Sequence, residues 1–225
     1  MKKIYVINHN SLIDNIVVRK RKEILEIIEK NISKNNIEDA IDIGSTEDKG
    51  NESSNYIIKN LTNIPKIISL SDQNINDNFF FKNIKKSITE DFSNEEIVKL
   101  KSDLVVSNAT IEHVGSLENQ KKMIQNIINL SKKYFVITTP NRFHPIEFHT
   151  KLLFLHWLPK NIYRKICKFI GLKFFSEEDN LNLLSKNDLI NLMKVIDFNN
   201  YQIFKIKLLG FVSNYILIGK INDSN

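Results

Sequence analysis

Cysteine, glycine and proline are scarce in this sequence, and it contains no long apolar run. Cys167 is the only cysteine among 225 residues, so a disulfide within the chain and a cluster of thiolate metal ligands are both excluded. No apolar stretch approaches the roughly 18 residues that a membrane-spanning helix needs. Residues 1–15 lack the apolar core of a signal peptide. These absences predict a cytoplasmic protein without a membrane span.

The composition is that of one globular domain. Hydrophobic residues make up 42% of the chain, enough for a full core, so we expect residues 1–225 to form one domain with an insert at about 145–196. The formal net charge is +6, but the lysines are scattered, and dense basic runs occur only at 19–22 and 160–173. Because nucleic-acid binding usually gathers basic and aromatic residues on one face, no nucleic-acid partner is expected.

Strand-like and helix-like patterns alternate along the chain. This alternation predicts an α/β fold with one seven-stranded, mostly parallel sheet and helices on both faces. The runs at 201–208 and 214–219 predict a terminal hairpin at one edge of that sheet. We expect Ser53 or Ser54 to cap the second helix, and Ser185 or Asn187 to lie near the cap of the last. The other strands are expected at 39–44, 66–70, 86–89, 103–107 and 134–138, and the helices at 13–32, 53–61, 94–101, 117–133, 160–175 and 181–196.

Polar residues follow the two central strands at the point where each strand ends. The run DLVVSNATIEHVGS begins at Asp103, and the run YFVITTPNRFHPIEFHT begins at Tyr134. Ligands of open α/β sheets bind beyond the carboxyl ends of the strands. We therefore expect the functional site at these two strand ends.

The loop after the first strand is acidic and poor in glycine. Gly44 is followed by Glu47, Asp48 and Glu52, whereas a dinucleotide pyrophosphate favours several glycines and bare backbone amides. These carboxylates would repel phosphate and attract a ligand that carries ammonium and sulfonium groups. The alternative is that the three acids are ordinary surface residues.

Two further acids follow the second and third strands. Asp72 lies where an acidic side chain accepts hydrogen bonds from ribose hydroxyls. Asp91 can meet an adenine amino group, and the alternative is that it only begins a loop.

Histidines and a glutamate gather between residues 113 and 156. His113 can transfer a proton, or it can hydrogen-bond the backbone and pack a helix. Glu147 and His149 can act as an orienting carboxylate and a base on the substrate side, or they can hold the loop together with His144. A metal site formed by these last three residues is not expected, because their spacing matches no helical HExxH motif.

The blocks DLVVSNATIEHVGS and ITTPNRFHPIEFHTKLLFLHWLP resemble those of class I S-adenosylmethionine-dependent methyltransferases that act on small molecules or glycans, over about residues 40–159. The resemblance implies a Rossmann-like fold and S-adenosyl-L-methionine as cofactor. It implies that the methionine part of the cofactor, its ribose and its adenine are contacted by Asp42, Gly44, Ser45, Thr46, Asp72, Asp91, Asn108 and Ala109. It further implies that His113, Glu147 and His149 face the acceptor.

The sequence leaves the identity of the methyl acceptor undetermined. The resemblance implies methyl transfer to a small molecule or to a cell-surface glycan, which can be lipid-linked, and oxygen is the expected methylated atom. Basic and aromatic residues within 145–175 are also typical of peripheral contact with the inner face of a membrane. Two alternatives stay open: a non-catalytic binding or assembly module with this fold, and a nicotinamide-linked oxidoreductase.

Overall fold

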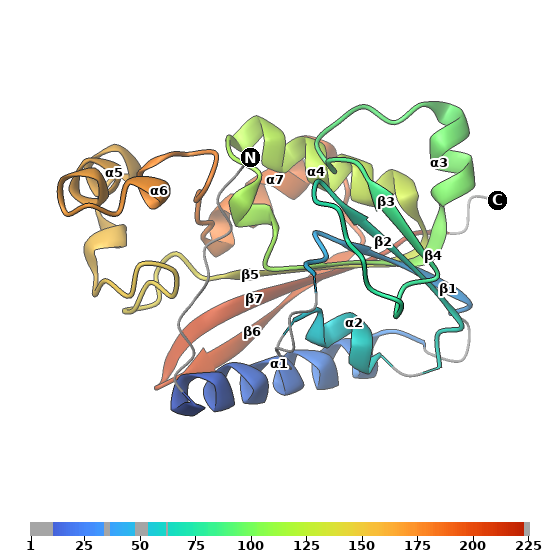
Figure 1. Cartoon of the computed structure of the whole chain (residues 1–225), viewed down its shortest axis with the longest axis horizontal. Coiled ribbons are helices and arrows are strands. Elements are labelled where there is room, and N and C mark those ends of the chain that lie inside the picture. The colour runs from blue at the N-terminus through green and yellow to red at the C-terminus, as the bar shows by residue number, and fades with distance from the viewer. Residues whose placement is uncertain (1–10, 34–36, 48–53, 62, 223–225) are drawn as a thin grey trace.

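The computed structural model describes residues 11–33, 37–47, 54–61 and 63–222, and its centre is a seven-stranded sheet (Figure 1). The strands are β1 (Asp39–Ile43), β2 (Lys66–Ser71), β3 (Lys82–Lys85), β4 (Ser102–Asn108), β5 (Ser131–Pro140), β6 (Tyr201–Leu208) and β7 (Phe211–Lys220). Their order is β3-β2-β1-β4-β5-β7-β6. The first five run parallel, and β7 pairs antiparallel with β5 and β6. The expected mostly parallel sheet and terminal hairpin are confirmed.

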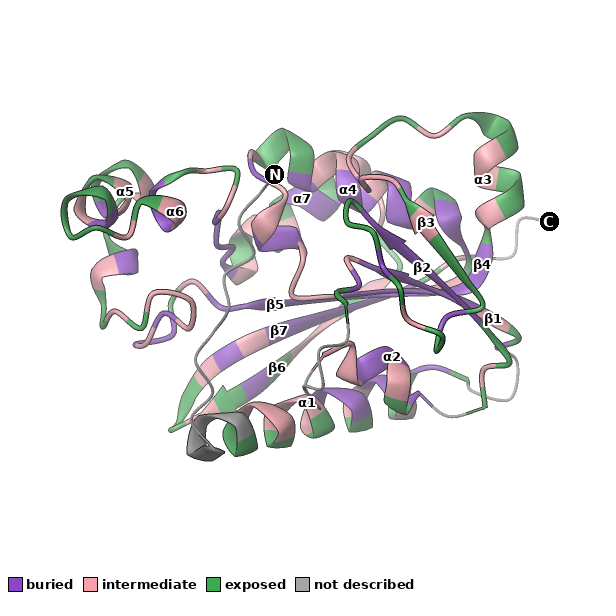
Figure 2. Ribbon diagram, viewed as in Figure 1, coloured by how far each residue is buried: buried purple, intermediate pink, exposed green. Residues whose placement is uncertain are grey.

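Helices cover both faces of this sheet (Figure 1). The longer ones are α1 (Ser11–Asn31), α3 (Asn94–Leu100), α4 (Leu117–Leu130) and α7 (Lys186–Ile196), and a short α2 (Tyr56–Asn60) lies beside α1. Successive residues of a strand point to opposite faces. Val105 of β4 therefore joins the core under α4 and α7, whereas Val106 joins the core under α1 and α2. Burial on both faces is visible along the central strands in Figure 2 and explains their continuous apolar runs.

The third strand lies earlier than expected, at Lys82–Lys85 instead of 86–89. Its residues are mostly exposed because it is the edge strand, so pairing with β2 defines it and no apolar pattern marks it. Residues 86–89 instead enter a turn in which the Ser87 amide donates to Glu90 Oε1 at 3.0 Å. The expectation from the sequence was wrong there because an edge strand carries little hydrophobic signal.

Two other boundaries moved for identifiable reasons. The helix expected at 117–133 ends at Leu130, where Ser131 Oγ donates to the Ile127 carbonyl and the chain turns directly into β5. The terminal hairpin has a two-residue connection, Leu209 and Gly210, in place of the expected five. Both residues have positive φ, 52° and 83°, as the tight turns of twisted hairpins require.

The region expected as one helix at 160–175 is two helices, α5 (Lys160–Phe169) and α6 (Lys173–Ser176). Gly171 has φ of 88°, and the Leu172 amide donates to the Cys167 carbonyl. This is a Schellman ending, which stops α5. These helices extend to one side of the sheet, together with the short η3 (Leu155–Trp157) (Figure 1).

The last helix begins at Lys186 instead of Leu181, and the expected Ser185 is its cap. Ser185 Oγ accepts from the Asp188 amide, and the Asp188 carboxylate accepts from the Ser185 amide. At α2 the cap is Asn55, with a left-handed backbone and no side-chain capping bond, so Ser54 is not the cap, and Ser53 lies outside the described residues. No helix in the described ranges has the length and apolar character needed to cross a bilayer.

Candidate functional site

Asp42 lies at the carboxyl end of β1 and is almost fully buried, with 5% of its surface exposed. Ser45 Oγ donates to Asp42 Oδ2 at 2.5 Å. Burial raises the pKa of Asp42 from its ordinary value of 3.8 to about 7, although the Ser45 hydrogen bond opposes the change. The end of β1 therefore holds a carboxyl group whose negative charge is poorly compensated within the protein.

Gly44 makes the turn that follows β1. Its φ is 81°, and its amide donates to the Leu70 carbonyl of β2 at 2.9 Å. Thr110, which follows β4, packs against it so closely that a Cβ at position 44 would lie 2.4 Å from Thr110 Oγ1. Thr110 Oγ1 also donates to the Ile43 carbonyl. A glycine is thus required both by the backbone conformation and by the neighbouring side chain.

Thr46 is held by Asn55, an asparagine that the sequence interpretation did not single out. Asn55 Oδ1 accepts from the Thr46 amide at 3.0 Å, and Asn55 Nδ2 donates to the Thr46 carbonyl at 2.8 Å. Glu47 is exposed, whereas Asp48 and Glu52 lie outside the described residues. The exchange of two bonds fixes Thr46 beside the start of α2.

The acids after β2 and β3 lie in different surroundings. Asp72 is exposed and directly follows β2, whose Leu70 pairs with Ile43 of β1, so Asp72 lies at the same sheet edge as Gly44. Asp91 pairs with Lys122 on α4 at 2.5 Å. That hydrogen bond and the lysine charge lower the pKa of Asp91.

Asn108 ends β4 and Ala109 follows it, next to the turn that Gly44 makes. Ile43 pairs with Ser107, and Asn108 Oδ1 accepts from Thr138 Oγ1 of β5 at 2.6 Å. Ala109 has φ of 53°, a left-handed conformation that is unusual for alanine, and its amide donates to the Thr138 carbonyl at 3.0 Å. The structure thus brings the expected residues of β1 and β4 to one edge.

Glu147 and His149 form a tight pair in the loop after β5. His149 Nδ1 and the His149 amide both lie within hydrogen-bond distance of Glu147 Oε1, at 2.7 and 2.9 Å, and the Thr150 amide donates to Oε2. Burial alone would raise the pKa of Glu147, but these hydrogen bonds outweigh it and lower the pKa to about 2. Burial alone would lower the pKa of His149, but Glu147 outweighs it and the pKa is raised.

His113 lies against this pair, at the end of η2 (Ile111–His113). The rings of His113 and His149 meet edge to face, with centroids 4.9 Å apart. Burial lowers the pKa of His113, although its Nδ1 donates to the Asn180 carbonyl at 2.7 Å. The three residues expected on the acceptor side, 36 positions apart at most, are therefore neighbours in space.

His144 and His156 have a structural role in the same loop. The His144 ring stacks on Phe148 with centroids 4.8 Å apart, and its Nδ1 lies 2.9 Å from the Ile146 carbonyl. His156 Nε2 donates to the His144 carbonyl at 2.7 Å. These contacts favour loop stabilisation as the role of His144, one of the two alternatives for the HPIEFH segment.

Residues 180–182, in the segment that precedes α7, form hydrogen bonds with η2 and with the residues that follow it. The Asn182 amide donates to the Glu112 carbonyl, and Asn182 Nδ2 donates to the Gly115 carbonyl, both at 2.7 Å. Gln120 Nε2 bridges the carbonyls of Asn182 and Ile111. No local pattern in the sequence indicates the contacts of Asn182, because they join segments more than 60 residues apart.

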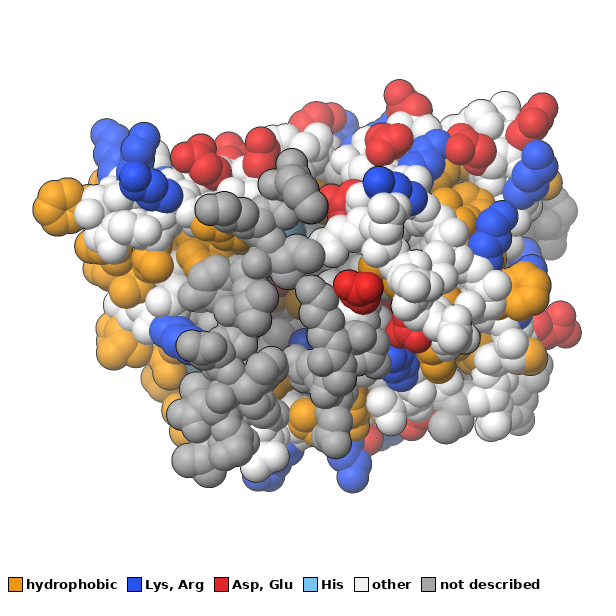
Figure 3. All heavy atoms as spheres, in the orientation of Figure 1, with side chains coloured by type: hydrophobic (Ala, Val, Ile, Leu, Met, Phe, Trp, Pro, Cys, Tyr) orange, Lys and Arg blue, Asp and Glu red, His pale blue; other side chains and the backbone are white. Residues whose placement is uncertain are grey.

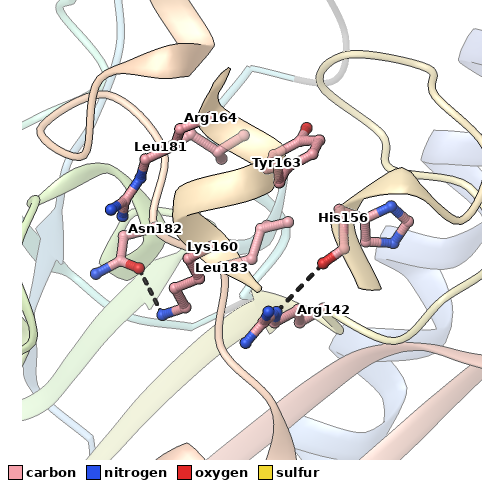
Figure 4. A pocket seen from close by; sticks show the side chains of 8 residues that line it. All are labelled: Arg142, His156, Lys160, Tyr163, Arg164, Leu181, Asn182 and Leu183. Atoms are coloured by element: carbon pink, nitrogen blue, oxygen red, sulfur yellow. Dashed lines mark hydrogen bonds between the residues drawn. The ribbon is translucent and has the colours of Figure 1, made fainter. Parts of the chain in front are cut away.

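A small pocket lies on the far side of this junction, between α5 and the segment that precedes α7 (Figure 4). Lys160 Nζ donates to Asn182 Oδ1 at 2.6 Å, and Arg142 Nε donates to the His156 carbonyl at 3.3 Å. Its lining consists of Arg142, His156, Lys160, Tyr163, Arg164, Leu181, Asn182 and Leu183. Lys160 thus joins α5 to the segment that precedes α7, and Arg142 joins the start of the loop after β5 to η3.

Glu112 is the functional candidate that the sequence interpretation passed over. It is 0% exposed, and its Oε2 accepts from Thr139 Oγ1 of β5 at 3.0 Å. One ligating atom from each of Glu112, His113 and His149 lies within 4.8 Å of the others. The signal that could have indicated it is a carboxylate next to a histidine shortly after a buried strand.

Comparison with known proteins identifies the fold. No family model matches the sequence, and neither does any curated protein. An O-methyltransferase family protein from Burkholderia thailandensis is 8% identical, with a TM-score of 0.52 over 95% of this chain and 59% of its own, so this chain spans less than two thirds of that protein.

Two structures with bound ligands are similar over most of their length. The 1,6-didemethyltoxoflavin-N1-methyltransferase of Burkholderia thailandensis, with bound 1,6-didemethyltoxoflavin and S-adenosylhomocysteine, is 10% identical, with a TM-score of 0.54 over 95% of this chain and 82% of its own. The magnesium protoporphyrin IX methyltransferase of Synechocystis PCC 6803, with bound S-adenosylhomocysteine, is 11% identical, with a TM-score of 0.53 over 97% and 90%. The chain therefore has the Rossmann-like fold of S-adenosylmethionine-dependent methyltransferases, and the resemblance drawn from its motifs is confirmed at the level of the fold.

Proposed function

We propose that this chain is an S-adenosylmethionine-dependent methyltransferase that methylates a small-molecule or glycan acceptor at oxygen. The observation that carries the proposal is the division of the sheet's carboxyl edge into two parts. Acidic and amide groups follow β1, β2 and β4, whereas a histidine–glutamate cluster follows β4 and β5. Similar folds with bound S-adenosylhomocysteine support the cofactor.

The residues present suit this cofactor better than a dinucleotide. Asp42 is a buried carboxyl group with a raised pKa, so a nearby ammonium group would stabilise its charged form. Asp72 is exposed at the same edge and can accept hydrogen bonds from ribose hydroxyls. The methionine part would be held by Asp42, Gly44, Ser45, Thr46, Asn108 and Ala109, and the adenine by Asp91.

The acceptor would lie on the side of His113, Glu147 and His149. The cofactor supplies a methyl group that is already activated by positive charge on sulfur. The protein must therefore position the acceptor oxygen and, for a hydroxyl, provide an acceptor for its proton. Glu147 holds Nδ1 of His149, which leaves Nε2 of that ring to take the proton. Oxygen is favoured over nitrogen because a hydroxyl is the acceptor that requires such a base.

Cofactor binding is the first test. Isothermal titration with S-adenosylmethionine and S-adenosylhomocysteine should give saturable binding, and Asp72→Asn should weaken it about 10- to 100-fold, since hydrogen bonds to charged groups contribute about 1.5–3 kcal/mol. Glu118→Gln, a charge change at an exposed position of α4, is the matched control. Absence of binding at millimolar ligand would leave the non-catalytic module as the better interpretation.

The division of the site is the second test. His149→Ala should reduce the rate of labelled methyl transfer into a fractionated cell extract by about 10²- to 10⁴-fold, the usual contribution of a general base. Its affinity for S-adenosylmethionine should stay close to that of the native chain. If His113→Ala and His149→Ala both abolish cofactor binding, the two sides of the edge do not have separate tasks.

We further propose that the segment 145–175 lies on an anionic membrane surface, where a lipid-linked glycan would be reached. Among the described residues, seven of the sixteen large hydrophobic side chains that are exposed fall within residues 145–175, and Phe169 is 91% exposed. Hydrophobic side chains gather at the end of the molecule that carries α5 and α6, with lysine and arginine beside them (Figure 3). Such a combination suits an interfacial surface.

Vesicle flotation tests the membrane contact. The full chain should float with vesicles that contain phosphatidylglycerol and less with vesicles of phosphatidylcholine alone, because the basic residues need an anionic surface. Phe169→Ser should weaken flotation, whereas Val98→Ser, at a position of α3 that is 77% exposed, should not. No flotation with either vesicle would remove the membrane proposal and leave the methyltransferase proposal intact.

A further inference from the structure

We infer that Glu112, His113 and His149 form a binding site for one divalent transition-metal ion of the zinc type. The three residues come from η2 and from the loop after β5, and one ligating atom of each lies within 4.8 Å of the other two. In a tetrahedral site with bonds of about 2.1 Å, ligand atoms are about 3.4 Å apart. To ligate one ion, these atoms would therefore have to approach one another by up to about 1.4 Å.

The hydrogen bonds of both histidines leave the same ring nitrogen available. His113 Nδ1 lies 2.7 Å from the Asn180 carbonyl, which can only accept, so Nδ1 carries the hydrogen. His149 Nδ1 lies 2.7 Å from the Glu147 carboxylate, which accepts in the same way. In the neutral rings Nε2 then carries the lone pair, and metal-binding histidines are usually held by such a carbonyl or carboxylate.

Glu112 supplies the third ligand atom and an independent reason for the site. Its side chain is 0% exposed, and Thr139 Oγ1 donates to its Oε2. In the part of the chain that the structure describes, its buried Oε1 has no hydrogen-bond partner. A buried carboxylate oxygen without a donor is costly, and a cation next to it removes that cost.

The donor set indicates the kind of metal. Two imidazole nitrogens and one carboxylate suit zinc and related first-row ions, whereas magnesium and calcium prefer oxygen ligands throughout. Three protein ligands leave one coordination position for water or another oxygen. This group differs from the His144, Glu147 and His149 set weighed from the sequence, since Glu147 here supports His149 from outside.

The metal site stands independently of the proposed methyl transfer, but its use there would rest on that proposal. An acceptor hydroxyl in the open position would have a lowered pKa, because the cation stabilises the oxygen anion. The same ion would occupy His149 Nε2 and so prevent that atom from accepting a proton. His149 would therefore accept the proton only in the metal-free chain, whereas in the zinc-bound chain the lowered pKa of the hydroxyl would take the place of that base.

Metal titration of the full chain, after removal of metals with a chelator, tests the site. Zinc should bind with one ion per chain by calorimetry, and cobalt should give the visible absorption of a low-coordinate nitrogen and oxygen site. His149→Ala should weaken zinc binding by more than about 100-fold, and Glu147→Gln, which removes only outer support, by about 10- to 100-fold. Glu118→Gln should have no effect.

The readouts separate this site from the cofactor site. Glu112→Gln should also lose zinc affinity, and if this buried change unfolds the chain, the more exposed His149→Ala still decides. S-adenosylmethionine binding should persist in the zinc-free protein. A failure of the metal site and a failure of the cofactor site can therefore be distinguished, because each has its own binding measurement. The inference is overturned if zinc does not bind saturably, or if binding is unchanged in His113→Ala and His149→Ala.

Discussion

The buried carboxyl group of Asp42 makes the stability of this protein depend on pH. Its pKa is raised by burial from 3.8 to about 7. In the unfolded chain the group ionises near pH 4, whereas in the folded chain it stays protonated until about pH 7. Folding therefore loses stability as the pH rises from about 4 to about 7, and the loss is complete above that range. Asp42→Asn removes the ionisable group and should abolish this dependence.

The size of the effect follows from the difference between the two pKa values. At about 1.4 kcal/mol per pKa unit, the raised pKa of Asp42 lowers the free energy of unfolding by about 4 kcal/mol above pH 7 and by about 1.5 kcal/mol at pH 5. The native chain should thus lose about 2.5 kcal/mol between pH 5 and pH 8 that the variant retains. Comparing the native chain with Asp42→Asn at two pH values is more informative than comparing them at one. Any effect of the asparagine amide on stability that does not depend on pH cancels in the difference.

Urea unfolding of the native chain and of Asp42→Asn at several pH values from 5 to 8 measures the effect. The variant's advantage in free energy of unfolding should grow steadily toward pH 7 and then level off. Ser45→Ala removes the donor that favours the charged form, so it should raise the pKa further and move the end of the window to higher pH. Glu118→Gln controls for the change in net charge.

The burial argument is refuted by one outcome in particular. If the free-energy curves of the native chain and of Asp42→Asn run parallel from pH 5 to pH 8, the carboxyl group has the same pKa in the folded and unfolded chains. If instead the free energy of unfolding of the variant falls relative to that of the native chain as the pH rises, the folded protein stabilises the charged form of Asp42.

Three further predictions concern the cofactor, the turn after β1 and the last helix. Affinity for S-adenosylmethionine should rise by up to about tenfold from pH 6 to pH 8 as Asp42 ionises, and a flat calorimetric profile would contradict contact with the ammonium group. Gly44→Ala should lower the free energy of unfolding in urea by several kcal/mol, because backbone strain and a clash with Thr110 combine. Gly210→Ala, at φ of 83° with nothing within 4 Å of the added Cβ, should lower it by only about 1 kcal/mol. Equal losses of stability would argue against the clash. Ser185→Ala should destabilise the chain by about 1 kcal/mol in thermal melts through loss of the cap, and an unchanged melting temperature would show that the cap is replaceable.

The sequence failed where structure is set by partners distant along the chain. The edge strand β3 has no apolar signature, so its place depends on pairing with β2. The contact between Asn182 and Glu112 joins segments 70 positions apart, and only the folded insert brings them together. Local propensity carries no information about such pairs.

The same limit of sequence information applies to the residues of the site. The sequence could indicate that Asp42, Asp72 and Asn108 follow strands, because apolar runs locate strand ends and parallel strands share one carboxyl edge. It could not indicate that Asp42 is buried beside Ser45 while Asp72 is exposed, since burial depends on what packs over the loop.

By itself the sequence determined the sheet, its two helical layers, the terminal hairpin and the edge at which a ligand would bind. These follow from hydrophobic periodicity, which acts over a few neighbouring residues. Only the tertiary structure decided that Glu112 joins His113 and His149, and that Nδ1 of both rings is engaged in a hydrogen bond. The reason is physical: the partners that orient each ring, Asn180 and Glu147, reach it through folding of the insert onto the end of β4.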